Sequence, residues 1–313
     1  MALEKVVLLV GGVGGAKLAY GLYHAMPPEN LTVIVNTGDD FWLYGLRICP
    51  DVDTITYTLS NRVNKTTGWG VADETFITLE TMPLLGETPW FRLGDKDLAL
   101  HMIRTQYLHK GKNLSEITKH FADSLGIRCK IVPMANEFIE TKVDTVEYGE
   151  LDFQEYFVKY RWQPTLKSLR LAGIDQATLN PIIQDAIHQA DMIIVGPSNP
   201  WLSINPILSI PGMRDLLRST HIPRIALTPL IQGQAVKGPT AKIMQEMGLS
   251  PSNESVIDYY GDVINGFVYD ERDHQPARSL ETLFSLDTLM DTEAKRITVA
   301  QNLLSQINDR IKL

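Results

Sequence analysis

The sequence has few cysteines and no excess of basic residues. Cys49 and Cys129 are its only two cysteines, too few for a disulfide framework. The seven histidines are scattered along the chain, so cysteine and histidine do not form the clustered pattern of a zinc site. Two thiols without a secretory context are typical of a reducing compartment, and we therefore expect a cytoplasmic protein.

Charge and hydropathy exclude two further classes of protein. The 29 Lys and Arg residues are outnumbered by 37 Asp and Glu residues, a formal net charge of −8. This balance argues against binding nucleic acid through a broadly basic surface. The first apolar run, Val6–Val10, is interrupted by glycines, whereas a membrane span needs about 20 apolar residues and a signal peptide also needs a longer stretch. We expect neither nucleic acid nor a membrane as a partner.

The sequence does contain the alternation of strands and helices that is typical of an α/β fold. The β-branched run Val6–Val10 predicts a buried parallel strand. A helix at 16–25 and a strand at Leu31–Val35 complete a βαβ unit. We predict a Rossmann-like, mostly parallel sheet. Further strands are expected at 128–134, 191–195, 224–227 and 263–269, and helices at 95–108, 114–125, 180–189, 211–218, 240–247 and 292–313.

The 313 residues are long enough for one large α/β domain, which we predict to span 1–313. Residues from approximately 60 to 165 show weaker periodicity and more polar stretches. We predict that they form a smaller helical or mixed subdomain inserted into the domain. Its candidate hairpin strands are 140–148 and 156–161.

A glycine-rich segment follows the first strand: Gly11-Gly12-Val13-Gly14-Gly15-Ala16-Lys17. Glycines allow the backbone to approach a ligand closely, and the N-terminus of the next helix favours a phosphate group. The segment is not a Walker A loop, because Lys17 is not followed by Ser or Thr. Its glycine spacing also departs from the dinucleotide fingerprint. We predict phosphate binding; a tight turn without a ligand is the alternative.

Acidic residues follow the second strand in two groups. Asn36-Thr37-Gly38-Asp39-Asp40 stands where an open parallel sheet binds ligands, and its carboxylates suit Mg²⁺. Alternatively, Asp39 caps the next segment and Asp40 faces solvent. In Pro50-Asp51-Val52-Asp53, an extended backbone would point Asp51 and Asp53 to one side. There they would bind metal or accept a proton from a substrate hydroxyl; an ordinary loop is the alternative.

Three later segments complete the candidate set. Arg92 is placed to reach a phosphate or a planar ring, and Asp95 suits a helix N-cap. His101 and Arg104 share one face of the predicted helix. The alternative is that this helix is capped and presents a charged, solvated face without a ligand. The loop 196–200, with Ser198 and Asn199, follows a buried strand and is fixed by two prolines. A similar loop at 228–239 carries Lys237, which either contacts an anion or faces solvent. Together these groups suit phosphoryl-type transfer, in which positioning and charge stabilisation dominate.

The ordered motifs resemble those of the 2-phospho-L-lactate transferases of coenzyme F420 biosynthesis. The likeness covers nearly the whole chain and includes Leu93-Gly94-Asp95-Lys96-Asp97, Trp69-Gly70, Pro211-Gly212-Met213-Arg214 and Asp270-Glu271-Arg272-Asp273. It implies a Mg²⁺-dependent, homodimeric transferase. The acceptor would be the deazaflavin Fo. The donor would be lactyl-2-diphospho-5'-guanosine or enolpyruvoyl-2-diphospho-5'-guanosine, and the products GMP and coenzyme F420-0 or its dehydro form.

The resemblance also implies roles for single residues. Asp53 and Arg92 match the Fo-binding acidic and basic positions and are the expected catalytic pair. From the placement of the carboxylates themselves, we expect Asp40, with Asp39 or Asp53, to bind Mg²⁺. The expected phosphate- and nucleotide-binding residues are Gly12, Gly14, Gly15, Lys17, Asn36, Thr37, Gly196, Ser198 and Asn199.

Two other functions stay open at this point. One is a regulatory protein of related fold that binds a nucleotide sugar without transferring a group. The other is a dinucleotide-dependent oxidoreductase, which fits the first βαβ unit but not its glycine spacing. The sequence also leaves open whether the donor carries lactate or enolpyruvate, because a pocket discriminates poorly between such similar groups.

Overall fold

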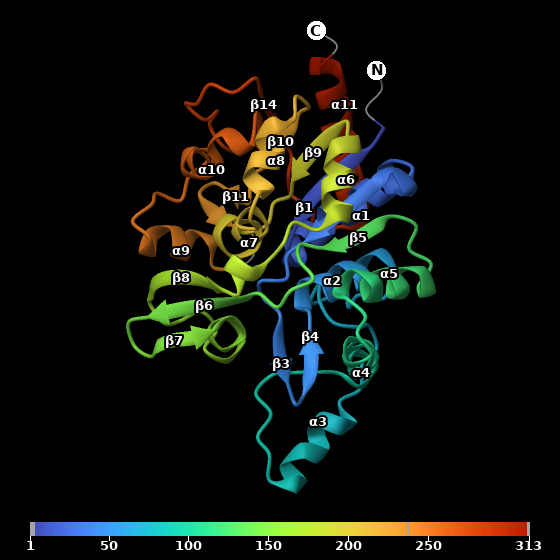
Figure 1. Ribbon diagram of the computed structural model, residues 1–313. Helices are drawn as coiled ribbons and strands as arrows, with labels where there is room; N and C mark the ends of the chain where they lie inside the picture. The colour runs from blue at the N-terminus through green and yellow to red at the C-terminus, as the bar shows by residue number, and fades with distance from the viewer. Residues whose placement is uncertain (1–3, 237, 312–313) are drawn as a thin grey trace.

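The computed structural model describes residues 4–236 and 238–311, and Figure 1 shows them around one central sheet. The sheet has seven strands in the order β14-β13-β10-β9-β1-β2-β5, and every pairing in it is parallel. This confirms the predicted α/β class. The strands are β1 (Val6–Val10), β2 (Leu31–Val35), β5 (Lys130–Pro133), β9 (Met192–Val195), β10 (Arg224–Leu227), β13 (Gly266–Asp270) and β14 (Thr282–Leu286).

Helices cover both faces of this sheet, so its central strands are apolar throughout. Successive side chains of β1 point to opposite faces: Val6, Leu8 and Val10 belong to one hydrophobic cluster, and Val7 and Leu9 to the other. The first cluster lies under α1 (Gly12–Ala25), α2 (Pro50–Leu59), α5 (Leu114–Ser124) and α11 (Glu293–Ile311). The second lies under α6 (Pro181–Gln189), α7 (Asn205–Leu208), α8 (Met213–Ser219), α9 (Thr240–Glu246) and α10 (Asn253–Tyr260).

The strand order reverses at β1. From β1 the chain passes outward to β2 and β5, then returns to form β9 on the other side of β1. The segments that follow β1 and β9 therefore lead to opposite faces of the sheet. They leave a crevice at the carboxyl ends of these strands, where open α/β sheets bind ligands.

The additional elements come from three segments of the chain (Figure 1). The predicted insert at about 60–165 includes β5, which belongs to the main sheet. Between β2 and β5 lie the hairpin β3 (Phe41–Leu43) and β4 (Leu46–Ile48), then α2, α3 (Ile77–Thr81), α4 (Asp95–His109) and α5. Between β5 and β9 lies an antiparallel sheet of β6 (Glu140–Thr145), β7 (Gly149–Asp152) and β8 (Leu166–Ala172). A small hairpin of β11 (Leu230–Ile231) and β12 (Gln234–Ala235) follows β10.

Some predicted boundaries are wrong. The predicted strand at 156–161 is instead a helical turn, Glu155–Lys159, whose Tyr156 packs against Val143 and Leu151. The helix after β1 begins at Gly12 rather than at residue 16, so the glycines form its first turn. β13 begins only at Gly266, after a 3₁₀ turn. The first three residues, Lys237 and the predicted end of the last helix at 312–313 lie outside the described residues.

Candidate active site

A cavity of about 410 Å³ opens at the crevice between β1 and β9, a size typical of small-molecule sites. Its walls come from segments far apart in the sequence. The first turn of α1, the first turn of α2 and the loop after β9 form one side, and the segment before α4 and residues after β7 form the other. The lining includes Gly11, Gly12, Gly14, Lys17, Asp39, Asp51, Asp53, Tyr57, Trp69, Phe91, Arg92, Asp97, His101, Phe153, Phe157, Ser198, Asn199, Thr228 and Thr240.

The glycine turn and the loop after β9 hold each other in place. The Ser198 hydroxyl accepts a hydrogen bond from the Gly11 N–H at 3.1 Å and donates one to the Gly11 carbonyl at 2.6 Å. A Cβ atom on Gly14 would lie 2.7 Å from the Pro197 carbonyl oxygen, so a side chain there would force the two segments apart. Glycine is thus required for close approach, and the backbone of α1's first turn faces the cavity.

Not all predicted nucleotide-binding residues reach the cavity. Gly12, Gly14, Lys17, Ser198 and Asn199 line it. Gly15 and Gly196 instead pack against the Val10 side chain. Thr37 is buried, and Asn36 acts on a neighbour: its Nδ2 donates to Asp51 Oδ2 at 2.9 Å.

The Asp51–Asp53 segment is helical, so the predicted extended backbone is wrong. Pro50 occupies the first position of α2, and both aspartates lie in its first turn. Residues two apart on a helix point about 200° away from each other. Asp51 accordingly bonds to Asn36 and the backbone of Gly12, whereas Asp53 bonds to Arg104 of α4.

Asp39 and Asp51 form a buried acidic pair on the wall of the cavity. Burial, and next the negative charge of Asp51, hold the pKa of Asp39 well above its ordinary value. Burial raises the pKa of Asp51 to about 7. Asp39 Oδ1 has no hydrogen-bond partner. A divalent cation would satisfy this orphaned oxygen and neutralise the repulsion between the two carboxylates, so the pair fits the Mg²⁺ that the family resemblance implies.

Asp40, one of the predicted metal ligands, is directed elsewhere. Its Oδ2 lies 2.7 Å from Nη2 of Arg47, and its side chain is outside the cavity lining. The guanidinium already neutralises this carboxylate, which leaves Asp39 as the member of the Asp39-Asp40 pair that faces a ligand.

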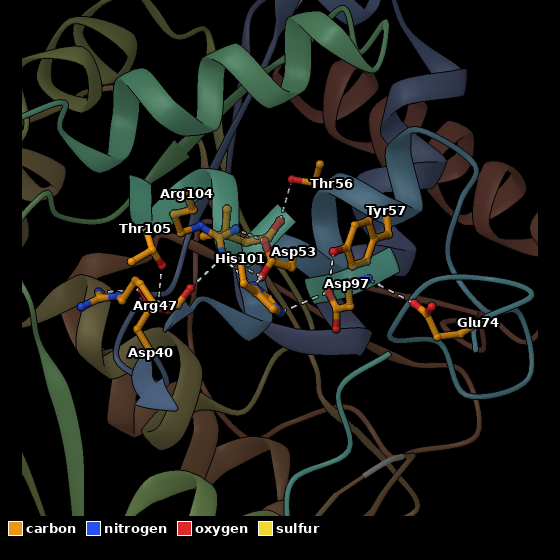
Figure 2. A network of polar contacts seen from close by, with 11 residues as sticks. Asp40, Arg47, Asp53, Thr56, Tyr57, Glu74, Asp97, His101, Arg104 and Thr105 are labelled. Carbon is orange, nitrogen blue, oxygen red and sulfur yellow. Dashed lines mark hydrogen bonds and ion pairs between the residues drawn. The ribbon is translucent and has the colours of Figure 1, made fainter. Parts of the chain in front are cut away.

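Asp53 lies in a network of buried polar side chains, which Figure 2 shows. Arg104 binds both of its carboxylate oxygens, and His101 Nδ1 lies 3.6 Å from Asp53 Oδ2. His101 Nε2 lies 3.3 Å from Asp97 Oδ1, which also accepts a hydrogen bond of 2.5 Å from the Tyr57 hydroxyl. Burial raises the pKa of Asp53, and the charge of Arg104 opposes that shift.

Asp53, Asp97 and His101 offer ligand atoms within 4.8 Å of one another, a possible metal-binding group. The buried guanidinium of Arg104 is bound to Asp53 and lies 3.1 Å from His101 Nδ1. Because this fixed positive charge would repel a second cation, we favour Asp39 and Asp51 over this group for a divalent metal.

The opposite wall is carried by the segment 62–94, which we call the arm. Arg92 is exposed, and its guanidinium stacks over the Phe76 ring at 4.0 Å. Asp95 is not the N-cap of α4; Gly94 is. Asp95 instead accepts hydrogen bonds from the N–H groups of Ile77 and Thr78 at 2.9 and 3.1 Å, and so caps α3. This bond fixes the arm to the start of α4.

Several residues of the site were not predicted. The aromatic side of the cavity uses Phe153 and Phe157, from the segment that follows β7. Tyr57 and Asp97 were not assigned roles, although the spacing of Asp97 and His101 places them one helical turn apart. The alternative of a solvated face for His101 and Arg104 is wrong, because both are about 1% exposed.

Comparison with known proteins decides among the open functions. The sequence profile described as "2-phospho-L-lactate transferase CofD" matches residues 6–304. This chain belongs to that family. It is 37% identical to a 2-phospho-L-lactate transferase of Methanosarcina barkeri, over 95% of this chain and 96% of that protein. It is 38% identical to a phosphoenolpyruvate transferase of Streptomyces coelicolor, over 86% of each chain. The expected CofD-type transferase of F420 biosynthesis is thereby confirmed.

A solved structure from Bacillus halodurans, a member of the UPF0052 family, shares the fold of this CofD-family chain. It has a TM-score of 0.56 at 17% identity and covers 86% of this chain and 81% of its own. At that identity the likeness concerns architecture alone. In the part of the chain that the structure describes, no helix has the length and apolar character needed to cross a bilayer.

Proposed function

We propose that this protein transfers a phospholactyl or phosphoenolpyruvyl group from a guanosine diphosphate ester to the ribityl hydroxyl of Fo. One observation carries the proposal. The first turn of α2 directs Asp51 to the glycine turn and Asp53 to the other side of the same cavity. A phosphate site and a candidate base thus stand on either side of a single helical turn.

In the proposed reaction the ribityl oxygen attacks the phosphorus that bears the acid group. A new oxygen–phosphorus bond forms, the bond from that phosphorus to the bridging oxygen breaks, and GMP leaves with the bonding electron pair. The hydroxyl proton passes to the Asp53 carboxylate, which lines the cavity. Burial raises the pKa of Asp53, which brings a carboxylate closer to the value suited to a general base.

The donor's diphosphate is assigned to the sheet side of the cavity. The backbone of the first turn of α1, with Lys17 and Ser198, lines that side, and helix N-termini favour phosphate groups. Asp39 and Asp51 would hold Mg²⁺, which supplies Lewis-acid stabilisation of negative charge on the diphosphate. This assignment replaces Asp40 and Asp53 of the predicted metal set.

The acceptor's flat ring is assigned to the aromatic side. Trp69, Phe91, Phe153 and Phe157 line that part of the cavity, and aromatic faces stack well on planar rings. Arg92 lines the same cavity and is exposed to solvent, so it can contact the ring or the transferring phosphate.

The test is incubation of the protein with Fo, Mg²⁺ and each guanylyl donor, with GMP release as the measurement. We expect GMP release that depends on Fo, and the preferred donor identifies the acid group. Binding of a uridine diphosphate sugar, without turnover of either guanylyl donor, would overturn the proposal in favour of a regulatory binder.

The role of Asp53 has its own test. We expect Asp53→Asn to lower kcat by about 10²–10⁴-fold, the usual contribution of a general base. Asp40→Asn is the matched control, because Asp40 is equally buried and bound to an arginine but lies outside the cavity lining. Normal turnover by Asp53→Asn would remove Asp53 from the chemistry.

We also propose that the protein is a cytoplasmic homodimer. Both cysteines are buried and unpaired, as suits a reducing compartment. On the arm, Ile77, Leu84 and Leu85 are 67%, 83% and 78% exposed, and such apolar patches commonly mark contacts between proteins. Light scattering of the protein and of a Leu84→Ser/Leu85→Ser variant tests the dimer, which the variant should weaken.

A further inference from the structure

Asp53 reaches the cavity from a buried ion pair. Arg104 lies behind it, about 1% exposed and outside the cavity lining. Its Nη1 donates to Asp53 Oδ2 at 3.1 Å, and its Nη2 bonds to Asp53 Oδ1. A guanidinium that grips both oxygens of a carboxylate fixes the plane of that carboxylate as well as its position.

We propose that Arg104 is a positioning residue for the transfer reaction, which holds the Asp53 carboxylate toward the acceptor hydroxyl. The inference rests on the proposed function of Asp53. Since Arg104 does not line the cavity, it acts through Asp53 rather than on a substrate. Figure 2 shows the Arg104 side chain next to Asp53 and His101.

The guanidinium of Arg104 is itself immobilised. Its Nη1 lies 3.2 Å from the Arg47 carbonyl oxygen and 3.1 Å from His101 Nδ1, and the group lies 5.8 Å from the centre of the Phe121 ring. A guanidinium that is held on several sides fixes the orientation of the carboxylate that it binds.

The neighbours of His101 determine which of its ring nitrogens carries the proton. The positive charge next to Nδ1 opposes a proton there, because a guanidinium can only donate. The ring proton is therefore assigned to Nε2, which faces Asp97. Asp97 in turn accepts from Tyr57, which follows Asp53 by one turn on α2. The network thus returns to the helix that carries Asp53.

The structure contains a second buried arginine–aspartate pair, which can be compared with the Arg104–Asp53 pair. Arg47 and Asp40 are 4% and 1% exposed and form an ion pair, yet Asp40 does not line the cavity. Burying an ion pair gains little stability over apolar packing of the same volume. The Arg104–Asp53 pair differs from its counterpart in that one of its members faces the candidate substrates.

The experiment compares Arg104→Lys with Arg47→Lys in steady-state kinetics at saturating donor. Lysine keeps the charge but loses the fork. For Arg104→Lys we expect kcat to fall by about 100-fold, the effect of a displacement on the order of 1 Å, with KM for Fo within about 3-fold of the parent. For Arg47→Lys, whose partner lies outside the cavity, we expect kcat within about 3-fold.

Two further measurements separate positioning from loss of folding. In Arg104→Ala, guanidinium chloride at a low, non-denaturing concentration should restore part of kcat by occupying the vacated space, and the same addition should not raise kcat of Arg47→Ala. Equal loss of kcat in the two lysine variants, or absence of rescue in folded Arg104→Ala, would overturn the proposal. So would unchanged kcat in Arg104→Lys.

A crystal structure of Arg104→Lys gives a readout that does not depend on turnover. A rotated Asp53 carboxylate supports the proposal, and an unmoved one contradicts it. If the parent protein fails to release GMP, the proposed function fails, and the crystal structure still decides whether Arg104 orients Asp53.

Discussion

The two walls of the cavity are built in different ways. The sheet-side wall is fixed by backbone contacts: Ser198 bonds to both the N–H and the carbonyl of Gly11, and Gly14 leaves no room for a Cβ beside Pro197. The arm-side wall presents side chains, among them Trp69, which is 47% exposed, and Arg92, which is stacked on Phe76. We infer from these contacts that the first wall is the more rigid and the second the more adjustable.

This difference suits two kinds of ligand. A diphosphate with its metal requires donors and charges at fixed positions, because electrostatic stabilisation depends on preorganisation. A flat aromatic ring is bound by contact area and tolerates small shifts. We therefore expect changes on the sheet side to reduce kcat strongly, and changes on the arm to affect mainly the KM for Fo.

After the Asp53→Asn change described above, the largest loss of kcat is expected for Asp39→Asn. Loss of a metal ligand should lower kcat by about 10²–10³-fold, the range seen when an electrostatic group of an active site is removed. The same change removes a carboxyl group whose ionised form is disfavoured by burial and by Asp51, so the metal-free variant should melt at or above the temperature of the parent. Steady-state kinetics measure the loss of kcat, and thermal melts measure the change in melting temperature. Parental activity in the variant would place the metal elsewhere.

Gly14→Ala should come next. The added methyl group would meet the Pro197 carbonyl at 2.7 Å, and a shift of the two segments on the order of 1 Å lowers activity by about 10²-fold. Gly126→Ala is the control: its φ of 71° makes alanine strained, but it lies away from the cavity. It should lose about 1 kcal/mol of stability and keep kcat. Equal activity of the two variants would show that the sheet-side wall is not rigid.

On the arm, Arg92→Met should raise the KM for Fo by about 10-fold, which corresponds to one charge-assisted contact, and change kcat less. Arg62→Met provides the comparison, since Arg62 is exposed on the same segment and outside the cavity lining. Initial rates over a range of Fo concentrations measure both parameters. If kcat of Arg92→Met fell as much as that of Gly14→Ala, the expectation that the arm affects mainly the KM for Fo would be wrong.

The smallest effect is a dependence of stability on pH. Asp51 has a folded-state pKa of about 7, whereas an unfolded aspartate titrates near 4. Its contribution to stability is therefore complete below about pH 4 and is lost as the pH rises through about 7. The metal-free protein should lose a few degrees of Tm over this range.

Mg²⁺ should restore that stability above about pH 7, because only the ionised pair binds it well. Differential scanning calorimetry at about pH 5.5 and about pH 8, with and without Mg²⁺, measures the effect. In Asp51→Asn the difference between the two pH values should shrink, and an unchanged difference would assign it to another group.

The sequence predicts the core of this fold well and the site less completely. Strands such as Val6–Val10 and Leu31–Val35 are short runs rich in β-branched residues and leucine, buried along their whole length, and burial on both faces leaves them few alternatives. The segment 156–161 is rich in aromatic residues that favour strands, but it also carries Lys159 and Arg161, and Tyr156 packs into a local cluster as part of a helical turn. Local composition does not distinguish a buried strand from a helical turn of this kind.

The carboxylates illustrate the other limit. Pro50 is a recognised first residue of helices, so the helical setting of Asp51 and Asp53 was open to prediction from the sequence. The burial of His101 and Arg104 was not, because it depends on Asp53, 51 residues away from Arg104. Contacts of that range depend on where the fold places α4 relative to α2, and they leave no local pattern in the sequence.

The first turn of α2 has a consequence for how this family diversifies. An Asp-x-Asp pair on a strand would give both carboxylates to one ligand, and a change in either substrate would disturb both residues. On a helix each carboxylate belongs to a different neighbour. In the proposed function, donor and acceptor would thus be read by separate parts of the chain, and one could evolve while the other is kept. Relatives named for phospholactate and for phosphoenolpyruvate are what such independence would produce.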